Sequence, residues 1–238
     1  LHLESDDPYE KTSPKIAKFI FEITLLYIIL TLICSILYFF SGMSGFDAFA
    51  HSMTTIATGG FSTSDQSFAK FNSNAIEWIC VCFMILGSLP FVVYLKSLRG
   101  NYKLIFKDDQ IKIFFSFVFI LVGLMSFWLL IISDYSLGTA IRESSFNIIS
   151  ILTGTGYSST NFNLWGSFGL VILFIIMFIG GCAGSTTGGI KIFRIQLLFS
   201  ASKAQINKLI QPHGVFVTKF NNKVIKEDAF MSVMGFFF

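Results

Sequence analysis

The chain has 238 residues, 53% of them hydrophobic and only 13% charged, with a mean hydropathy of +0.70. Soluble domains carry about a quarter charged residues, so this composition excludes an ordinary soluble domain and indicates a membrane protein. The net charge is only +3, so the position of the charges matters more than their sum, and no nucleic-acid partner is expected.

The first part of the chain predicts a polar segment followed by a membrane span. Residues 1–15 are polar, contain Pro8 and Pro14 as helix breakers, and are expected to lie in water. The apolar run 18–40 is long enough to cross a bilayer, which takes about 20 residues. Gly42 and Gly45 end this run.

A short helix and a second span follow. Residues 47–57 predict a helix of about 10 residues, which cannot cross a membrane. A glycine-rich segment and a polar stretch come next. Residues 75–98 then predict a second span, with Gly87 and Pro90 as kink points.

The same order of elements recurs. Residues 111–132 predict a span and residues 138–152 a short helix, which a second glycine-rich segment follows. A span begins again at residue 164, but residues 180–189 contain five glycines and interrupt it. The chain is therefore expected to be all-helical and built from two units of span, half-helix, loop and span.

The expected organisation covers the whole chain. We expect the chain to be an internal piece of a longer membrane protein, because Leu1 is not an initiator Met and a new apolar run starts at the C-terminus. The expected order begins with a cytoplasmic segment (1–15), a first repeat (16–99) and a cytoplasmic linker (100–110). A second repeat with a broken second helix (111–199), a second cytoplasmic linker (200–228) and the start of a further span (229–238) follow.

Basic residues predict the orientation of these spans. Of the 17 Lys and Arg residues, all but Lys70 and Arg142 lie before the first unit, between the units or after the second. Cytoplasmic loops are rich in Lys and Arg, so these three segments are expected to be cytoplasmic. The two half-helices would then enter the membrane from the outer side.

The most informative feature is a pattern that occurs twice, 96 residues apart. Residues 55–63 read TIATGGFST and residues 151–159 read ILTGTGYSS. Irregular backbone at membrane depth is tolerated only where protein or a water-filled path surrounds it, and glycine permits unusual backbone conformations there. Such loops can direct carbonyl oxygens at a dehydrated cation. The residues expected to do so are Thr58, Gly59, Gly60, Phe61, Thr153, Gly154, Thr155, Gly156 and Tyr157.

The half-helices would add to this electrostatic effect. Each would point its C-terminus, which carries partial negative charge, at the middle of the membrane. Asp47 and Glu143 are expected near the two N-termini, where they complement the positive pole. Phe61 and Tyr157 are expected to wedge the loops against neighbouring helices. The alternative is a pair of tight turns that bind no ion.

With these motifs in view, the chain resembles the Trk/Ktr/HKT superfamily of potassium transporters, and within it the bacterial TrkH branch. The resemblance lies in residues 50–63 (AHSMTTIATGGFST), 153–157 (TGTGY) and 180–191 (GGCAGSTTGGIK). It extends over essentially the whole chain. It implies four repeats around one pore, of which this chain would supply the second, the third and the start of the fourth, with Gly60 and Gly156 as filter glycines.

The resemblance also implies a gate, partners and a location. The residues expected to form an intramembrane gating loop are Gly180, Gly181, Cys182, Ala183, Gly184, Ser185, Thr186, Thr187, Gly188 and Gly189. The expected surroundings are a lipid bilayer, a homodimer and the bacterial inner membrane. A cytoplasmic TrkA-type nucleotide-binding ring is the expected regulator, with Lys191 and Arg194 as candidate contacts or, alternatively, as topology anchors.

Other interpretations of the glycine-rich break fit less well. It can be a static kink or a helix-packing face of small residues. A phosphate-binding loop needs G-x-x-x-x-G-K-[ST] after a strand, and Gly188-Gly189-Ile190-Lys191 lacks the Lys-Ser/Thr pair. A serine hydrolase would need a base beside Ser185, whereas His51 is expected to pack behind the first loop. The four cysteines lie in apolar runs as small fillers.

The prediction is therefore uptake of K+ through a gated, channel-like pore without covalent chemistry, so no enzyme and no organic cofactor are expected. Two alternatives remain. The first is a sodium or mixed potassium and sodium transporter of the same family, and the second is a non-conducting membrane scaffold.

Overall fold

The structure is a computed structural model that describes residues 8–211, 214, 219–220, 223–224 and 235. These residues are mainly helical, apart from a short antiparallel pair formed by β1 (Lys219–Phe220) and β2 (Lys223–Val224). The further span expected at 229–238 lies outside the described residues, except for Gly235.

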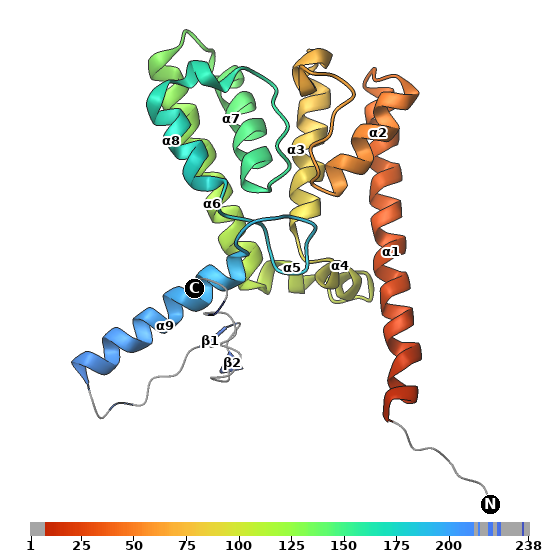
Figure 1. The fold of residues 1–238 in the computed structure, drawn as a ribbon, viewed down its shortest axis with the longest axis vertical. Coiled ribbons are helices and arrows are strands. Elements are labelled where there is room, and N and C mark those ends of the chain that lie inside the picture. The colour runs from red at the N-terminus through yellow and green to blue at the C-terminus, as the bar shows by residue number, and fades with distance from the viewer. Residues whose placement is uncertain (1–7, 212–213, 215–218, 221–222, 225–234, 236–238) are drawn as a thin grey trace, which may run out of the picture.

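Two helices are long and apolar enough to cross a membrane, namely α1 (Pro8–Phe40), through its part Ile16–Phe40, and α6 (Asp109–Ile132). Both run along most of the height of the bundle (Figure 1). The prediction that Pro8 and Pro14 break the helix is wrong, because α1 begins at Pro8 and continues through Pro14. Pro8 fits the first turn of α1 because the amide hydrogen it lacks would have no partner there.

Two shorter helices, α2 (Gly45–Ile56) and α7 (Leu137–Leu152), are the predicted half-helices. Each begins after a serine whose hydroxyl accepts a backbone hydrogen bond, Ser44 from Asp47 and Ser136 from Thr139. Helix α2 packs along α1 and α7 along α6, and both begin at the upper end of the bundle and stop inside it (Figure 1).

The expected second span is not one kinked helix. It consists of α3 (Asn74–Ser88) and α4 (Phe91–Leu98), which meet at an angle of 90°. The turn arises because Leu89 is extended (ψ 156°), as a residue before proline prefers, and Pro90 cannot continue the helix. Helix α4 and α5 (Lys103–Lys107) therefore lie across the lower end of the bundle (Figure 1). A short 3-10 helix, η1 (Ser67–Phe71), precedes α3.

The predicted interruption of the last span is present. After η2 (Phe162–Trp165), helix α8 (Gly166–Ile176) stops, and helical structure resumes only at α9 (Ile192–Ile210). Helix α9 extends away from the bundle (Figure 1) and runs to Ile210, well into the stretch expected to be a linker.

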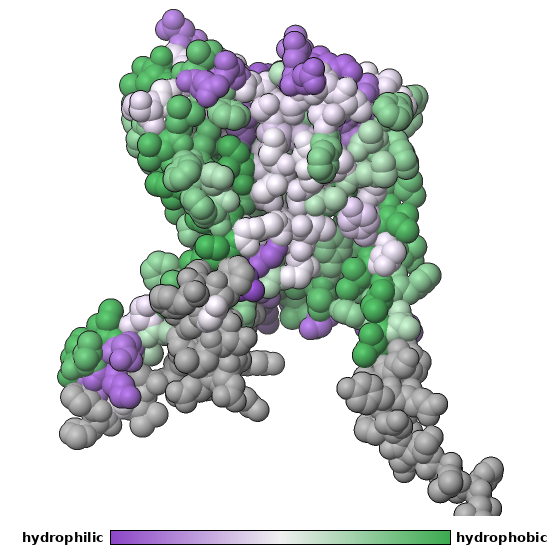
Figure 2. Space-filling model, viewed as in Figure 1, coloured by the Kyte–Doolittle hydropathy of each residue, from purple (hydrophilic) through white to green (hydrophobic). Residues whose placement is uncertain are grey.

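The surface and the core fit an environment of lipid. Large exposed apolar side chains are carried by α1, α6 and α8, and Figure 2 shows hydrophobic flanks below a hydrophilic upper rim. The buried core draws on most of the helices and includes Phe68, whose ring contacts those of Phe146 and Tyr157. Two spans are present among the described residues, or three if the bent pair counts as one.

Candidate functional site

The first repeated pattern forms a tight irregular turn after α2, here called loop A (residues 57–63). The amide of Gly59 donates to the carbonyl of Thr54 (2.8 Å), which turns the chain back on its helix. Thr58 (φ 50°) and Gly60 (φ 69°) both have positive φ, which is uncommon for threonine. Loop A is therefore held in an unusual backbone conformation, as the sequence predicts.

The second pattern forms the corresponding turn after α7, here called loop B (residues 153–159). The amide of Gly156 donates to the carbonyl of Ser150 (3.1 Å), and Gly154 and Gly156 have φ of 73° and 86°. Both glycines line a cavity of about 490 Å³, whose other wall is formed by apolar side chains of α8.

Loops A and B touch each other directly. A Cβ atom placed on Gly60 would lie 1.7 Å from the carbonyl oxygen of Thr155. Only glycine therefore fits at this contact, and two carbonyl-rich segments that are far apart in sequence become neighbours. This contact is the central geometric feature of the candidate site.

Equivalent hydroxyls fix the two loops on their helices. Thr54 Oγ1 donates to the carbonyl of Phe61 (2.9 Å), and Ser150 Oγ donates to the carbonyl of Tyr157 (2.7 Å). Each donor and each acceptor is 96 residues from its counterpart. Sequence reasoning assigned these two hydroxyls no role, although the same 96-residue offset would have identified them as a pair.

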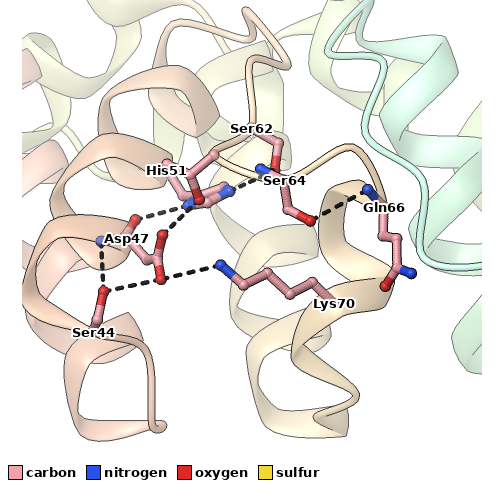
Figure 3. Close-up of polar contacts among 8 residues, drawn as sticks. Ser44, Asp47, His51, Ser62, Ser64, Gln66 and Lys70 are labelled. Atoms are coloured by element: carbon pink, nitrogen blue, oxygen red, sulfur yellow. Dashed lines mark hydrogen bonds and ion pairs between the residues drawn. The ribbon is translucent and has the colours of Figure 1, made fainter.

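A second equivalent pair lies one turn earlier. His51 Nδ1 is 2.8 Å from the carbonyl of Asp47, and Nε2 is 2.9 Å from Ser62 Oγ (Figure 3). Because a carbonyl only accepts, Nδ1 carries the hydrogen, and the neutral ring accepts from Ser62 at Nε2. Asn147 Nδ2, 96 residues later, donates to the carbonyl of Glu143 (2.9 Å) and to Ser159 Oγ (3.0 Å).

These contacts bear on the roles of both side chains. His51 is fully buried and packs edge-on against Phe68 and Phe71, so the expected packing position behind loop A is confirmed. Asn147 is also fully buried, and sequence reasoning did not identify it.

Asp47 occupies the predicted place in the first turn of α2. Its carboxylate accepts from Ser44 (2.9 Å) and Thr63 (2.5 Å) and lies 3.6 Å from Lys70 Nζ (Figure 3). The hydrogen bonds from Thr63 and Ser44 lower the pKa of Asp47 below its usual value. Asp47 thereby joins the start of α2 to the end of loop A and to η1.

Glu143 lies farther from the N-terminus of its helix than Asp47 does. Helix α7 begins at Leu137, so Glu143 lies beyond the first turn. Burial raises the pKa of Glu143, although Tyr135 donates a hydrogen bond to it. Arg142 lies 3.8 Å from Glu143 and 3.0 Å from Glu77, so it joins α7 to α3. Sequence reasoning gave this ion-pair cluster no role.

The two aromatic residues of the loops differ. Tyr157 is 1% exposed, and its hydroxyl bonds with Thr54 Oγ1 and lies 3.3 Å from the carbonyl of His51, so it wedges loop B against α2. Phe61, by contrast, is 78% exposed and does not wedge loop A. In Phe61 the backbone carbonyl is fixed, by the hydrogen bond from Thr54, and the ring is not.

The glycine-rich loop (residues 180–189) is closed at its base. Ile179 and Ile190 form a bridge in which the amide of Gly180 donates to the carbonyl of Ile190 (2.9 Å). A Cβ on Gly180 would lie 2.0 Å from the carbonyl oxygen of Gly188, so the two sides of the loop approach closely because one is glycine. The loop is an ordered, non-helical segment.

Other elements hold this loop through its backbone. The amide of Cys182 donates to the carbonyl of Ser88 (3.0 Å), and the amide of Phe91 donates to the carbonyl of Gly184 (3.0 Å). These two bonds use backbone groups that the break between α3 and α4 leaves free. In addition, the amide of Ala183 donates to Gln110 Oε1 (2.8 Å) at the start of α6.

The glycine-rich loop also reaches both candidate ion-binding segments. Thr186 Oγ1 donates to the carbonyl of Ile56 (2.8 Å), the last residue of α2. A Cβ on Gly154 would lie 3.6 Å from the backbone nitrogen of Gly188, which places the loop beside loop B. Within the loop, Ser185 and Thr187 bond with each other (2.8 Å).

The basic residues that follow the loop are not simple surface groups. Lys191 Nζ donates to the carbonyl and to the hydroxyl (3.0 Å) of Thr187, so this side chain braces the glycine-rich loop. Cys34, Cys80 and Cys182 are buried as expected of fillers, whereas Cys82 is exposed, and all four are free thiols.

Comparison with known proteins places this fold. A family model described as TrkH, a cation transport protein, matches residues 4–238. The chain is 34% identical over 238 residues to the Trk system potassium uptake protein TrkI of Halomonas elongata, covering 100% of this chain and 48% of that protein. It is 34% identical over 229 residues to the Trk system potassium uptake protein TrkH of Escherichia coli K12, covering 95% and 47%.

A solved structure agrees with both matches. The crystal structure of the potassium transporter TrkH from Vibrio parahaemolyticus superimposes with a TM-score of 0.86 at 32% identity, over 99% of this chain and 50% of that one. The chain spans about half the length of the curated relatives it matches. The predicted all-helical membrane fold is thus confirmed, and the chain belongs to the TrkH family of cation transport proteins.

Proposed function

We propose that this chain supplies two filter segments and the gate of a potassium-uptake transporter. The observation that carries the proposal is the direct contact of loops A and B at Gly60 and Thr155. It gathers backbone carbonyls from two repeats where α2 and α7 end. The relatives named as potassium uptake proteins support K+ as the transported ion.

The proposed binding of K+ is entirely electrostatic. Carbonyl oxygens of residues 58–61 and 153–157 replace water around the ion, and the C-terminal ends of α2 and α7 add partial negative charge. The glycine-rich loop lies beside both segments and obstructs the path until it moves. Its irregular backbone, held by hydrogen bonds to residues 87–91 and to Gln110, suits a segment with two discrete positions.

The proposed setting follows the charge pattern and the family. The basic segments 96–112 and 191–226 face the cytoplasm of a bacterium, and α2 and α7 start at the outer face of its inner membrane. The complete transporter is a homodimer regulated by a TrkA-type nucleotide-binding ring. Arg194 is a candidate contact for that ring, as is Lys191 if it releases Thr187.

The test is growth and ion uptake by a bacterium that lacks potassium uptake systems. The gene that encodes this chain is expressed at its full genomic length, and rubidium uptake is measured as a tracer for K+, alongside sodium uptake. Rescue of growth at low K+ with rubidium uptake supports the proposal. Sodium uptake alone would favour the sodium transporter, and uptake of neither ion by an expressed, membrane-inserted protein would favour the scaffold.

A further inference from the structure

Thr186 has an unusual position among the residues of the glycine-rich loop. Ser185 and Thr187 bond to each other inside the loop, whereas Thr186 reaches two other elements. Its amide donates to the carbonyl of Gly87 in α3 (3.1 Å), and its hydroxyl lies 3.0 Å from that carbonyl and 2.8 Å from the carbonyl of Ile56.

The carbonyl of Ile56 depends on this hydroxyl. It is the last carbonyl of α2, and the three before it accept amide hydrogens from residues 57–59. A hydroxyl has one hydrogen to donate, and the amide of Thr186 already serves Gly87, so the hydroxyl hydrogen is available for Ile56. The equivalent carbonyl in α7, that of Leu152, receives no such hydrogen bond within the described part of the chain.

The junction around this carbonyl is tightly packed. A Cβ on Gly87 would lie 3.0 Å from the carbonyl oxygen of Ile56 and 3.2 Å from Thr186 Oγ1. Helix α3 therefore approaches the end of α2 at a glycine, and Thr186 closes the junction. Ile56 is fully buried, and a buried carbonyl without a donor is costly.

We propose that Thr186 is a latch that couples the gate to the ion site. While the glycine-rich loop is closed, the Thr186 hydroxyl occupies the carbonyl oxygen of Ile56. When the loop opens, this oxygen is released at the negative end of α2, directly before loop A, where a dehydrated cation can take the place of the hydroxyl hydrogen. This inference rests on the proposed function, because it assigns a residue to the gating of the same site.

A coupling in both directions follows. The hydroxyl and the cation compete for one oxygen, so each cation bound there favours the open loop, and an open loop favours cation binding. Thr186 is a positioning residue in this scheme, since it acts on the ion through the carbonyl of Ile56. A purely structural role would not make loop opening depend on K+.

The experiment measures loop opening and transport separately in the full-length protein. Cys182 lies in the loop and is fully buried, so its rate of reaction with a small thiol reagent reports opening, in a background where the exposed Cys82 is replaced by serine. Rubidium uptake is measured on the same variants. Thr186→Val removes the donor at nearly constant size, and Thr186→Ser restores it.

A matched control is available on α1. Thr31 is also largely buried, but its hydroxyl bonds to the carbonyl of Tyr27 in its own helix (2.9 Å), so Thr31→Val makes the same chemical change away from the loop. We expect Thr186→Val to raise the Cys182 reaction rate and rubidium uptake about fivefold, the shift that loss of one ordinary hydrogen bond produces. We expect Thr186→Ser and Thr31→Val to resemble the parent protein.

The potassium dependence gives the decisive readout. Replacing choline by K+ should speed the Cys182 reaction in the parent and not in Thr186→Val. Equal rates and equal K+ responses in both proteins would overturn the latch. If Thr186→Val does not fold, Gly87→Ala, which crowds the same junction, must raise the reaction rate instead. Absence of rubidium uptake by the parent would refute the proposed function, whereas the thiol reaction still decides on the latch.

Discussion

The two repeats follow one backbone plan but are anchored differently. In both, a half-helix ends at an equivalent residue, Ile56 or Leu152, and a hydroxyl from the helix holds the following loop. The helix after each loop then breaks. In the first repeat the break is a sharp turn at Pro90, and in the second it is the ordered loop 180–189.

The difference also connects the two repeats. The glycine-rich loop belongs to the second repeat, yet three of its backbone groups bond with residues 87–91 of the first repeat. A duplicated pattern therefore gives two similar loops, which we propose bind the ion, and the breaks that follow the pattern make the pair asymmetric. Substitutions at equivalent residues of the two repeats test this difference.

The largest expected difference in ion uptake is between variants of the two proposed filter glycines, Gly60 and Gly156. Gly60→Ala would place a methyl group on the carbonyl of Thr155, so we expect it to separate the two loops and abolish rubidium uptake. A Cβ on Gly156 meets nothing within 4 Å, so Gly156→Ala adds only the strain of positive φ, about 1 to 2 kcal/mol. We expect reduced but measurable uptake from this second variant.

Rubidium uptake, normalised to the amount of protein in the membrane, distinguishes Gly60→Ala from Gly156→Ala. Equal activity of both alanine variants would contradict the direct contact of loops A and B. Gly123→Ala serves as the matched control, because this glycine lies within α6 with open space at its Cβ position.

The next contrast concerns the side chains that brace each loop. His51→Ala removes two hydrogen bonds and an aromatic packing partner, so we expect it to lower the free energy of unfolding by about 3 kcal/mol. Asn147→Ala removes two hydrogen bonds, and we expect a loss of about 2 kcal/mol. Thermal unfolding in detergent measures both, and a negligible effect of Asn147→Ala would refute its equivalence to His51.

The aromatic residues predict a smaller contrast. Tyr157→Phe removes the hydroxyl that joins loop B to α2, and we expect it to destabilise the protein by about 1 kcal/mol and to weaken discrimination between K+ and Na+. Phe61→Leu changes an exposed ring and should leave unfolding unaltered. Paired measurements of unfolding temperature and of rubidium uptake in competing sodium test this prediction. If both variants unfold alike, the wedge role of Tyr157 is wrong.

The smallest expected difference is in how the stability of Asp47 and Glu143 variants depends on pH. The pKa of Asp47 is lowered, so its charge stabilises the fold at neutral pH, and this contribution is lost as pH falls through the folded-state pKa. Asp47→Asn should therefore be less stable than the parent at pH 7, and the gap should close in acid. The pKa of Glu143 is raised, so the parent loses stability as pH rises through that pKa.

Glu143→Gln should therefore be more stable than the parent at neutral pH, and its advantage should vanish below the ordinary pKa of glutamate. Unfolding temperatures of both variants across a pH series give the sign in each case. Parallel curves for the two variants would show that the equivalent carboxylates share one environment.

Sequence reasoning located the elements whose length or composition decides their structure. The apolar runs 18–40 and 111–132 are spans because of their length, and the ends of α2 and α7 follow from the glycines after them. The break at 180–189 was likewise readable from its five glycines. These features depend on local chemistry, so one sequence is sufficient to find them.

The remaining features depend on contacts between distant segments. The 90° turn at Pro90 is stabilised by the bond from Phe91 to Gly184, and no local pattern predicts that partner. Helix α7 begins at Leu137 and α2 at Gly45, so Glu143 lies beyond the first turn of its helix, whereas the equivalent Asp47 lies within the first turn. Tyr157 and Phe61 occupy equivalent positions of the repeat, but Tyr157 is buried and Phe61 is exposed.

The right-angle junction between α3 and α4 has a mechanical consequence. Phe91, the first residue of α4, holds Gly184, and Ser88, the last of α3, holds Cys182. Helix α4 lies across the lower end of the bundle, and its first residue is bonded to the glycine-rich loop (Figure 1). A tilt of α4 would therefore strain the bond to Gly184.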